Sequence, residues 1–116
     1  MLHHIVLMKF KPSVSEEQIH HLVQMLDALP DKIIEIQTYE FGRDVLRSER
    51  SYDFALVSGF ANLEAMQRYQ THTEHQKVLA HLRDICEDIR AVDFVTEYSA
   101  PDSLADPDPF RGFQMP

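Results

Sequence analysis

The sequence predicts an α+β domain in which a four-stranded antiparallel sheet carries helices on one face. Four segments place apolar residues with the period of two that is typical of strands. Between the first and second segments, and again between the third and fourth, apolar stripes follow helical spacing. At 116 residues, the chain is long enough for one domain with one core. This order, β-α-β-β-α-β, favours helices on a single side of the sheet.

The first half of the chain supplies two predicted strands and a helix. The first strand runs from Leu2 to Lys11, and a capping box at Ser15–Gln18 opens the helix. The helical stripe comprises Ile19, Leu22, Val23, Leu26 and Leu29. We expect Leu29-Pro30-Asp31 to end this helix. A second strand follows from Ile33 to Phe41, and Gly42 indicates a bend or a bulge.

In the second half, residues 43–51 are expected to form an exposed, mobile connection to a third strand from Tyr52 to Phe60. Asn62 is the predicted N-cap of a short helix, and the capping box Thr73–Gln76, with Thr73 as N-cap, starts a new one. The second stripe comprises Val78, Leu79, Leu82, Ile85, Cys86 and Ile89. The fourth strand is predicted from Ala91 to Tyr98.

Residues 1–98 form the predicted domain, and residues 99–116 form a Pro-rich C-terminal tail. Prolines and a glycine exclude regular structure from this tail. The tail is either disordered or docked on the body or on a partner subunit, and Phe110 and Phe113 favour docking.

The order of elements is the split βαβ arrangement of ferredoxin-like domains. Its first and third predicted strands carry apolar residues on both faces, although helices cover only one side of the sheet. A second copy whose sheet packs against the first would cover the other side and enclose a barrel-like interior. The strand chemistry therefore predicts a homodimer, a dimeric α/β barrel.

Composition excludes several classes of partner. The formal charge of −8 argues against nucleic acid and anionic membranes, and no apolar run approaches the length of a membrane span. We expect no signal peptide, because the chain starts directly with a strand. The one cysteine, Cys86, cannot form an internal disulfide, so a cytoplasmic location is expected.

The stretch from Tyr69 to Gln76 gathers groups that exchange protons or hydrogen-bond an oxygen near neutral pH. His75 shares a helical face with the apolar stripe. It is either a base that removes a proton next to a carbonyl or a structural histidine bonded to the backbone. Tyr69 either holds a carbonyl or enolate oxygen or fills the seam between helix and sheet. His72 is interpreted as a turn residue.

His4 lies on a strand face with Val6, Met8 and Phe10, and is either structural or an assistant to catalysis. We predict no transition-metal site, because neither His-x-x-x-His nor a Cys/His cluster of ligand spacing occurs. An oxygen-ligated Mg²⁺ or Na⁺ is left open. No cofactor is expected, since the sequence lacks a Gly-rich phosphate loop.

Several pieces of the chain resemble the Dabb family, the stress-responsive α/β-barrel domains. They are His4–Lys11, Tyr52–Val57, Phe60–Met66, Tyr69 with His72–Gln76, and Val92–Phe94. The resemblance covers residues 2 to about 98. It implies a ferredoxin-like fold and a homodimer whose two sheets form a barrel.

Most members of the family have no assigned reaction, but a plant member closes a polyketide ring by aldol chemistry without a cofactor. The resemblance places its junction tyrosine at Tyr69, its junction histidine at His75 and its first-strand histidine at His4. Its third-strand histidine has no counterpart, because Phe54 stands there.

Two main functions remain open. The first is a domain of uncharacterised activity that binds a small apolar or aromatic ligand in its interior, with Phe54, Met8 and Leu79 as the expected ligand-binding residues. The second is a cofactor-independent cyclase or lyase in which His75 is the base, Tyr69 holds the carbonyl oxygen and His4 assists. Stress protection by assembly into larger oligomers is a third possibility.

Overall fold

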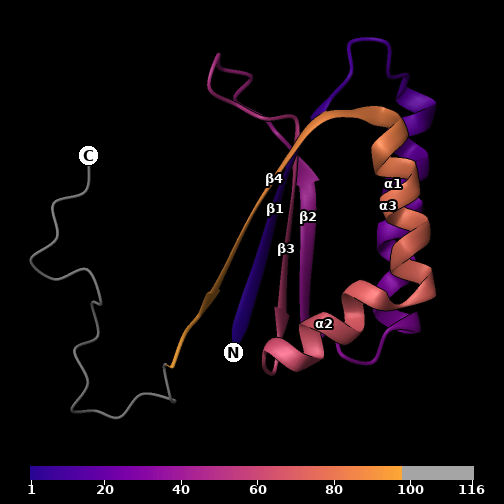
Figure 1. Cartoon of the computed structure of the whole chain (residues 1–116). Helices are drawn as coiled ribbons and strands as arrows, with labels where there is room; N and C mark the ends of the chain where they lie inside the picture. Colours follow the sequence, from indigo (N-terminus) through magenta and orange to yellow (C-terminus); the bar gives the residue numbers. More distant parts are fainter. Residues whose placement is uncertain (98–116) are drawn as a thin grey trace, which may run out of the picture.

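The computed structural model describes residues 1–97, which form four strands and three helices (Figure 1). The elements are β1 (Leu2–Phe10), α1 (Glu16–Lys32), β2 (Thr38–Arg43), β3 (Phe54–Phe60), α2 (Leu63–Thr71), α3 (Thr73–Ile85) and β4 (Cys86–Val95). The sheet is antiparallel, with strand order β2-β3-β1-β4. The predicted ferredoxin-like α+β fold is confirmed. Tyr98 and the predicted tail, including Phe110 and Phe113, lie outside the described residues.

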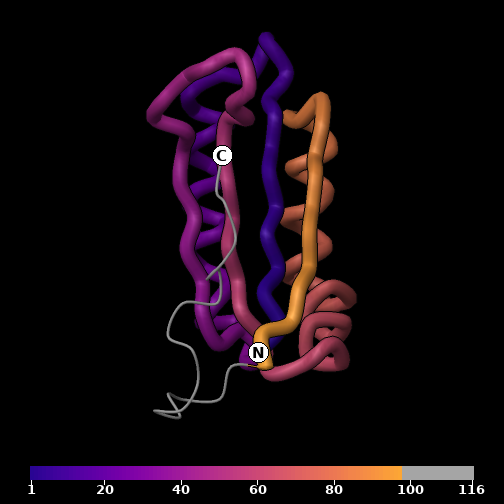
Figure 2. The backbone as a smooth tube through the Cα atoms, turned by 90° about the vertical axis from the view of Figure 1, so that its left-hand side faces the viewer, coloured from indigo at the N-terminus to yellow at the C-terminus, as the bar shows by residue number. Residues whose placement is uncertain are grey.

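All three helices lie on one side of the sheet (Figure 1), and Figure 2 looks onto the other side. We call these the helix face and the outer face. Alternate residues of β1 (Leu2, His4, Val6 and Met8) point to the helix face and are buried there. The outer face is also apolar but stays in contact with water. It carries Leu7, Val57, Val92 and Phe94, which are 39 to 55% exposed. The prediction of a sheet with two apolar faces is confirmed.

Helix α1 begins as predicted and ends later than predicted. The Ser15 hydroxyl accepts a hydrogen bond from the Gln18 N–H at 3.2 Å, which closes the expected capping box. The expected stop at Leu29-Pro30-Asp31 is wrong, because the helix continues to Lys32. The fixed φ of Pro30 is compatible with a helix, although its ring removes one N–H donor and crowds the carbonyl one turn earlier. The Ile33 N–H closes the end by donating to the Leu29 carbonyl at 2.9 Å.

The strand boundaries on this side also differ from the prediction. Strand β2 begins at Thr38 rather than Ile33, because Ile33 is the buried C-cap of α1 and Ile34 points into solvent. Ile33 therefore ends the helix, and Ile34 lies in the connection to β2. No bend or bulge occurs at Gly42, which pairs regularly with Ala55. Strand β3 begins at Phe54, two residues later than expected.

The chain passes from α3 to β4 without a loop. Cys86 is both the C-cap of the helix and the first residue of the strand. The predicted helical stripe therefore ends at Ile85, and Ile89 belongs to β4, where it pairs with Met8. The predicted start of the strand at Ala91 is wrong for the same reason.

One residue, His72, links the two helices of the second half. Its backbone N–H donates to the Tyr69 carbonyl at 3.1 Å and closes α2. Its ring Nδ1 accepts a hydrogen bond from the Glu74 N–H at 3.1 Å, which makes His72 the N-cap of α3. The prediction of Thr73 as N-cap is therefore wrong by one residue, and His72 is more than a turn residue. The asparagine cap of α2 is confirmed, since the Asn62 side chain accepts from the Ala65 N–H.

Replacing His72 tests this assignment of the cap. We expect His72→Ala to lower the free energy of unfolding by about 1 kcal/mol, the usual cost of losing an N-cap acceptor. His72→Asn supplies a capping oxygen in place of the ring nitrogen and should recover most of that loss. Thr73→Ala is the matched control at the neighbouring position and should change stability little. Urea unfolding measures all three, and a larger loss for Thr73→Ala than for His72→Ala would contradict the cap seen in the structure.

Candidate functional site

The junction between α2 and α3 fixes the relative positions of Tyr69 and His75. Tyr69 lies in the last turn of α2 and His75 in the first turn of α3, and their ring centroids are 4.2 Å apart. The Nδ1–H of His75 donates to the Gln70 carbonyl at 3.1 Å, because a carbonyl can only accept. In the neutral ring this leaves Nε2 unprotonated. The junction therefore presents a phenol and a basic nitrogen side by side.

Below this junction, one polar row crosses the helix face of the sheet. Tyr39, Ser58, His4 and Asp93 are direct cross-strand partners on β2, β3, β1 and β4. The neighbouring row on the same face is entirely apolar and consists of Phe41, Leu56, Val6 and Ala91. Ser58 and His4, in the middle of this row, are buried, and buried polar groups require partners.

The part of the row on β1 and β4 is a carboxylate–imidazole pair. The Nδ1 of His4 hydrogen-bonds the Asp93 carboxylate, which accepts and so holds the proton on Nδ1. His4 is 6% exposed, and its ring meets the Tyr69 ring edge-on at 6.2 Å between centroids. The Nε2 of His4 makes no hydrogen bond within the described residues, and its ring lies next to Tyr69.

The part of the row on β3 and β2 has unused hydrogen-bonding capacity. The Ser58 side chain is fully buried, and its hydroxyl donates only to the backbone carbonyl of His4, at 3.3 Å. The buried hydroxyl of Tyr39 has no partner within the described residues. Leaving such a group unpaired costs roughly 1–3 kcal/mol.

His4, Tyr69 and His75 line one cavity of about 430 Å³ between the helices and the sheet. This volume lies within the range of small-molecule sites. The other lining residues are Val6, Met8, Leu26, Leu56, Gln70, Thr71, Gln76, Val78, Leu79, Leu82, Ile89 and Ala91. The structure thus brings together all three residues that the sequence suggested for catalysis, and two of those suggested for ligand binding, Met8 and Leu79.

Phe54 does not belong to this group. Its ring packs between Phe10 and Phe41, with centroids 6.1 and 6.0 Å away, and it does not line the cavity. The expected contact of Phe54 with a ligand stays a prediction that this cavity does not support. Two residues further along β3, Leu56 supplies the third strand's part of the wall.

The electrostatics of the cavity favour neutral groups. Burial lowers the pKa of His75 below 6.5, and the hydrogen bond to the Gln70 carbonyl offsets part of this shift. Burial also raises the pKa of the Tyr69 phenol well above its usual value, so the hydroxyl stays protonated. Of residues 1–97, no Lys, Arg, Asp or Glu side chain lines the cavity.

Three atoms can address a bound oxygen or an acidic proton: the Tyr69 hydroxyl and the Nε2 atoms of His75 and His4. None of them hydrogen-bonds to another residue of the described chain. A phenol donates to a carbonyl or enolate oxygen, and an unprotonated imidazole accepts a proton or a hydrogen bond. The arrangement can therefore orient a carbonyl or hydroxyl compound and can accept a proton from it.

Sequence reasoning missed Asp93 and Ser58. Both are non-local neighbours of His4, and their proximity depends on strand register, which short motifs do not reveal. The only signal was an aspartate within the predicted apolar fourth strand. Cys86 remains a poor nucleophile, since burial raises the pKa of its thiol to about 11.

Two specific features do not occur within residues 1–97. No three His, Cys, Asp or Glu side chains of this part of the chain are placed to hold a metal ion. None of its helices combines the length and apolar character needed to cross a membrane.

Comparison with solved structures identifies dimeric relatives of unknown function. A dimeric ferredoxin-like protein from Thermobifida fusca is 30% identical, with a TM-score of 0.76, and the match covers 82% of this chain and 90% of that one. A dimeric protein of ferredoxin-like fold from Bacteroides fragilis is 32% identical, with a TM-score of 0.70, covering 80% of this chain and 93% of the other.

Comparison with curated sequences and with family profiles identifies the family of this chain. The stress-response A/B barrel domain-containing protein DABB1 of Arabidopsis thaliana is 27% identical over 110 residues. That match covers 92% of this chain and 52% of DABB1, so the chain spans about half the length of this relative. The profile of the stress responsive A/B barrel domain matches residues 2–96, and the chain therefore belongs to the Dabb family.

Proposed function

We propose that this chain is a dimeric Dabb domain that binds a small, neutral, mainly apolar ligand by an oxygen atom. One observation carries this proposal: Tyr69, His75 and His4 converge on a single apolar cavity of about 430 Å³. Sites for small molecules combine apolar walls with a few placed polar groups, as this cavity does. The bound oxygen would accept from the Tyr69 hydroxyl or donate to an imidazole nitrogen.

The absence of charged side chains from the described cavity wall defines the ligand class further. A carboxylate or phosphate would lose its hydration without gaining a cationic partner, which is costly. A ketone, an ester or a phenol satisfies the polar groups without this cost. We therefore assign neutral aromatic or aliphatic carbonyl and phenolic compounds as ligands.

Binding of matched probes tests the role of Tyr69. We expect 2-acetylnaphthalene to bind, 2-ethylnaphthalene to bind more weakly because it lacks the carbonyl, and 2-naphthoate to bind least because it is charged. Tyr69→Phe should weaken the ketone about three- to tenfold, the effect of one hydrogen bond of roughly 1 kcal/mol, and leave the ethyl compound unchanged. Isothermal titration calorimetry measures each dissociation constant.

Tyr39→Phe is the matched control, because it also removes a phenol from the helix face but outside the cavity wall. It should leave the affinity for all three probes unchanged. Equal loss of ketone affinity in Tyr39→Phe and Tyr69→Phe, or no loss in either, would contradict the proposed contact with Tyr69.

The homodimer is proposed from the outer face of the sheet. Leu7, Val57, Val92 and Phe94 stay in contact with water in the single chain, and the relatives from Thermobifida fusca and Bacteroides fragilis are dimeric. Covering such a patch with a second copy removes apolar surface from water at roughly 25 cal/mol per Å².

A charge on the outer face should separate the dimer. We expect Val92→Glu to raise the dimer dissociation constant at least 100-fold, because the carboxylate would be buried without a partner. Leu63→Glu is the control: Leu63 is similarly exposed, at 48% against 55% for Val92, but lies on α2. Sedimentation equilibrium distinguishes the two, and a wild-type monomer at micromolar concentration would refute the dimer.

A second candidate function is cofactor-independent proton transfer, favoured by the unprotonated His75 Nε2 beside Tyr69. In this reaction Nε2 of His75 takes a proton from the carbon next to a carbonyl. The C–H electron pair forms the new carbon–carbon double bond of an enolate, and the carbonyl π pair moves onto oxygen. Tyr69 donates to that oxygen, and His4, oriented by Asp93, assists. The reaction is completed in one of two ways: His75 returns the proton to the carbon, or the enolate carbon attacks a second carbonyl, whose π pair moves onto its oxygen and takes the proton from His75.

Exchange of the methyl protons of 2-acetylnaphthalene in D₂O, followed by NMR, tests this candidate. Because the pKa of His75 is lowered from 6.5, the base stays neutral at pH 7. The exchange rate should fall as the pH is lowered through the pKa of His75, with a midpoint below 6.5. His75→Ala should abolish the catalysed exchange, and His81→Ala on the same helix should not. A midpoint above 6.5, or exchange that survives in His75→Ala, would contradict His75 as the base.

The proposal also includes a boundary and a location. We propose a domain of residues 1–98 followed by a Pro-rich tail of residues 99–116, and the family match to residues 2–96 supports this boundary. A cytoplasmic location is supported by the single cysteine, Cys86, which is free.

A further inference from the structure

The loop between β2 and β3, residues 44–53, carries the most exposed apolar pair of the described chain. Val45 is 95% exposed and Leu46 is 76% exposed. They are consecutive, and they lie between Asp44 and Arg47, whose contact closes a turn. Central turn positions usually hold Gly, Pro, Asn or Asp, so valine and leucine there have no local structural purpose.

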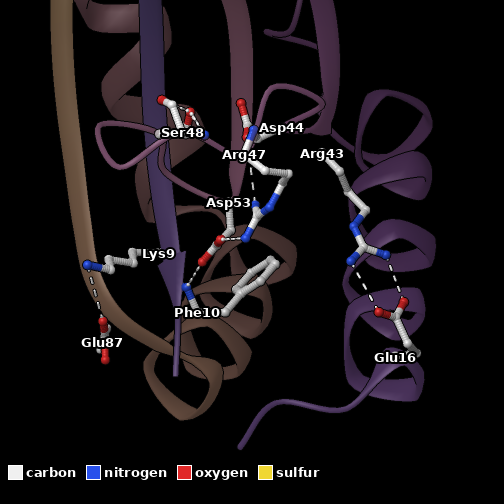
Figure 3. A network of polar contacts seen from close by, with 10 residues as sticks. Lys9, Phe10, Glu16, Arg43, Asp44, Arg47, Ser48, Asp53 and Glu87 are labelled. Atoms are coloured by element: carbon white, nitrogen blue, oxygen red, sulfur yellow. Dashed lines mark hydrogen bonds and ion pairs between the residues drawn. The ribbon is translucent and has the colours of Figure 1, made fainter. Parts of the chain in front are cut away.

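This loop is held rigidly by its own polar contacts (Figure 3). The Asp44 carboxylate accepts from the Arg47 N–H at 2.6 Å, and the Arg47 guanidinium lies 2.9 Å from the Asp53 carboxylate. Asp53 in turn accepts from the Phe10 N–H at 2.7 Å, which ties the loop to the end of β1. A further hydrogen bond within the loop joins the hydroxyls of Ser48 and Ser51 at 2.8 Å.

The backbone of the turn is strained. Arg47 adopts a φ of 54°, the left-handed conformation that residues other than glycine seldom occupy. Such a conformation costs on the order of 1 kcal/mol or more and persists only where surrounding contacts hold it. The contacts of Arg47 with Asp44 and Asp53 fulfil this condition. The loop thus holds Val45 and Leu46 in one fixed, exposed position.

The loop stands on the outer face of the sheet. In Figure 1 it projects, at the upper left, on the side opposite to the helices. Its last residues cross that face: the Tyr52 hydroxyl donates to the Asp88 carboxylate on β4 and accepts from the Arg90 side chain. A hollow of about 210 Å³ lies between the loop and the sheet, bounded by Leu7, Arg50 and Ala55 among others.

We propose that this loop is an arm of the homodimer, in which Val45 and Leu46 of each copy pack against the second copy. The inference rests on the proposed dimer and adds a contact outside the flat sheet. In a two-fold interface the same surface faces itself, so each dimer contains two such arms. The arms extend the apolar outer face at one end of the strands and limit how the two sheets rotate on each other.

A second copy is the occupant that the structure favours. The arm rises from the same face as Leu7, Val57 and Val92, so its apolar tip continues the surface proposed as the dimer interface. The two relatives that are 30% and 32% identical are dimeric. The polar contacts within the loop order it before association, which lowers the entropy lost when a second copy binds.

A double substitution at the tip tests the arm. Val45→Ser with Leu46→Ser removes both apolar side chains from solvent-exposed positions, so circular dichroism and thermal unfolding of the diluted protein should match the wild type. We expect the dimer dissociation constant, measured by sedimentation equilibrium, to rise at least tenfold. The control is Ile34→Ser, which removes an equally exposed apolar side chain, 92% exposed, before the opposite end of β2. It should change the dissociation constant less than twofold.

The outcomes separate the arm from the dimer itself. An unchanged dissociation constant in the double variant, combined with dissociation of Val92→Glu, would overturn the arm and leave the sheet-face dimer intact. Equal weakening by Ile34→Ser would also overturn it, because the effect would then not be specific to the loop. A wild-type chain that stays monomeric would overturn both proposals.

Discussion

The register of the central strand is the constraint on which the rest of the structure depends. Strand β1 pairs with both β3 and β4, and this pairing aligns His4 with Ser58 on one side and with Asp93 on the other. A slip of one residue would move His4 to the outer face and bring Ile5 into the core. Val6 and Met8 lie on the same face as His4 and are buried with it, so their burial depends on the same alternation. The packing of the core and the geometry of the polar row are therefore fixed together.

The second constraint is the junction of α2 and α3. A single residue, His72, ends one helix with its N–H and begins the next with its ring, so the two helices meet with no free linker. Tyr69 precedes this short connection and His75 follows it, and their two rings are in contact. Neither helix could rotate without losing a cap. The candidate site thus obtains its rigidity from backbone hydrogen bonds instead of from packing alone.

The architecture and three site residues could be predicted from the sequence, because they depend on local patterns. Period-two alternation identified the strands, and the apolar stripe placed His75 on the inner side of its helix. The predicted boundaries of helices and strands are wrong where a helical pattern and a strand pattern overlap. Cys86 and Ile89 continue the helical spacing of α3, but both residues pair with β1 and therefore belong to β4. Ile33 resembles a strand residue but is buried beneath the end of α1.

Non-local contacts account for what the sequence did not reveal at the site. Asp93 becomes important only because β4 brings it beside His4, 89 positions away in the chain. Phe54 was assigned to the cavity through its position in a motif, whereas packing against two other phenylalanines directs it elsewhere. Such choices depend on which side chains compete for the same volume in the core. Local spacing contains no information about that competition.

The cavity and the outer face are two sides of the same strands, and this links ligand binding to association. In β1, His4, Val6 and Met8 contact the cavity, and the residues between them, Ile5 and Leu7, lie on the outer face. A sheet with one face left in water gains stability from being covered. A second copy on the outer face would hold the strands in their register, and that register aligns His4 with Asp93. The candidate site should therefore be better ordered in the dimer than in the single chain.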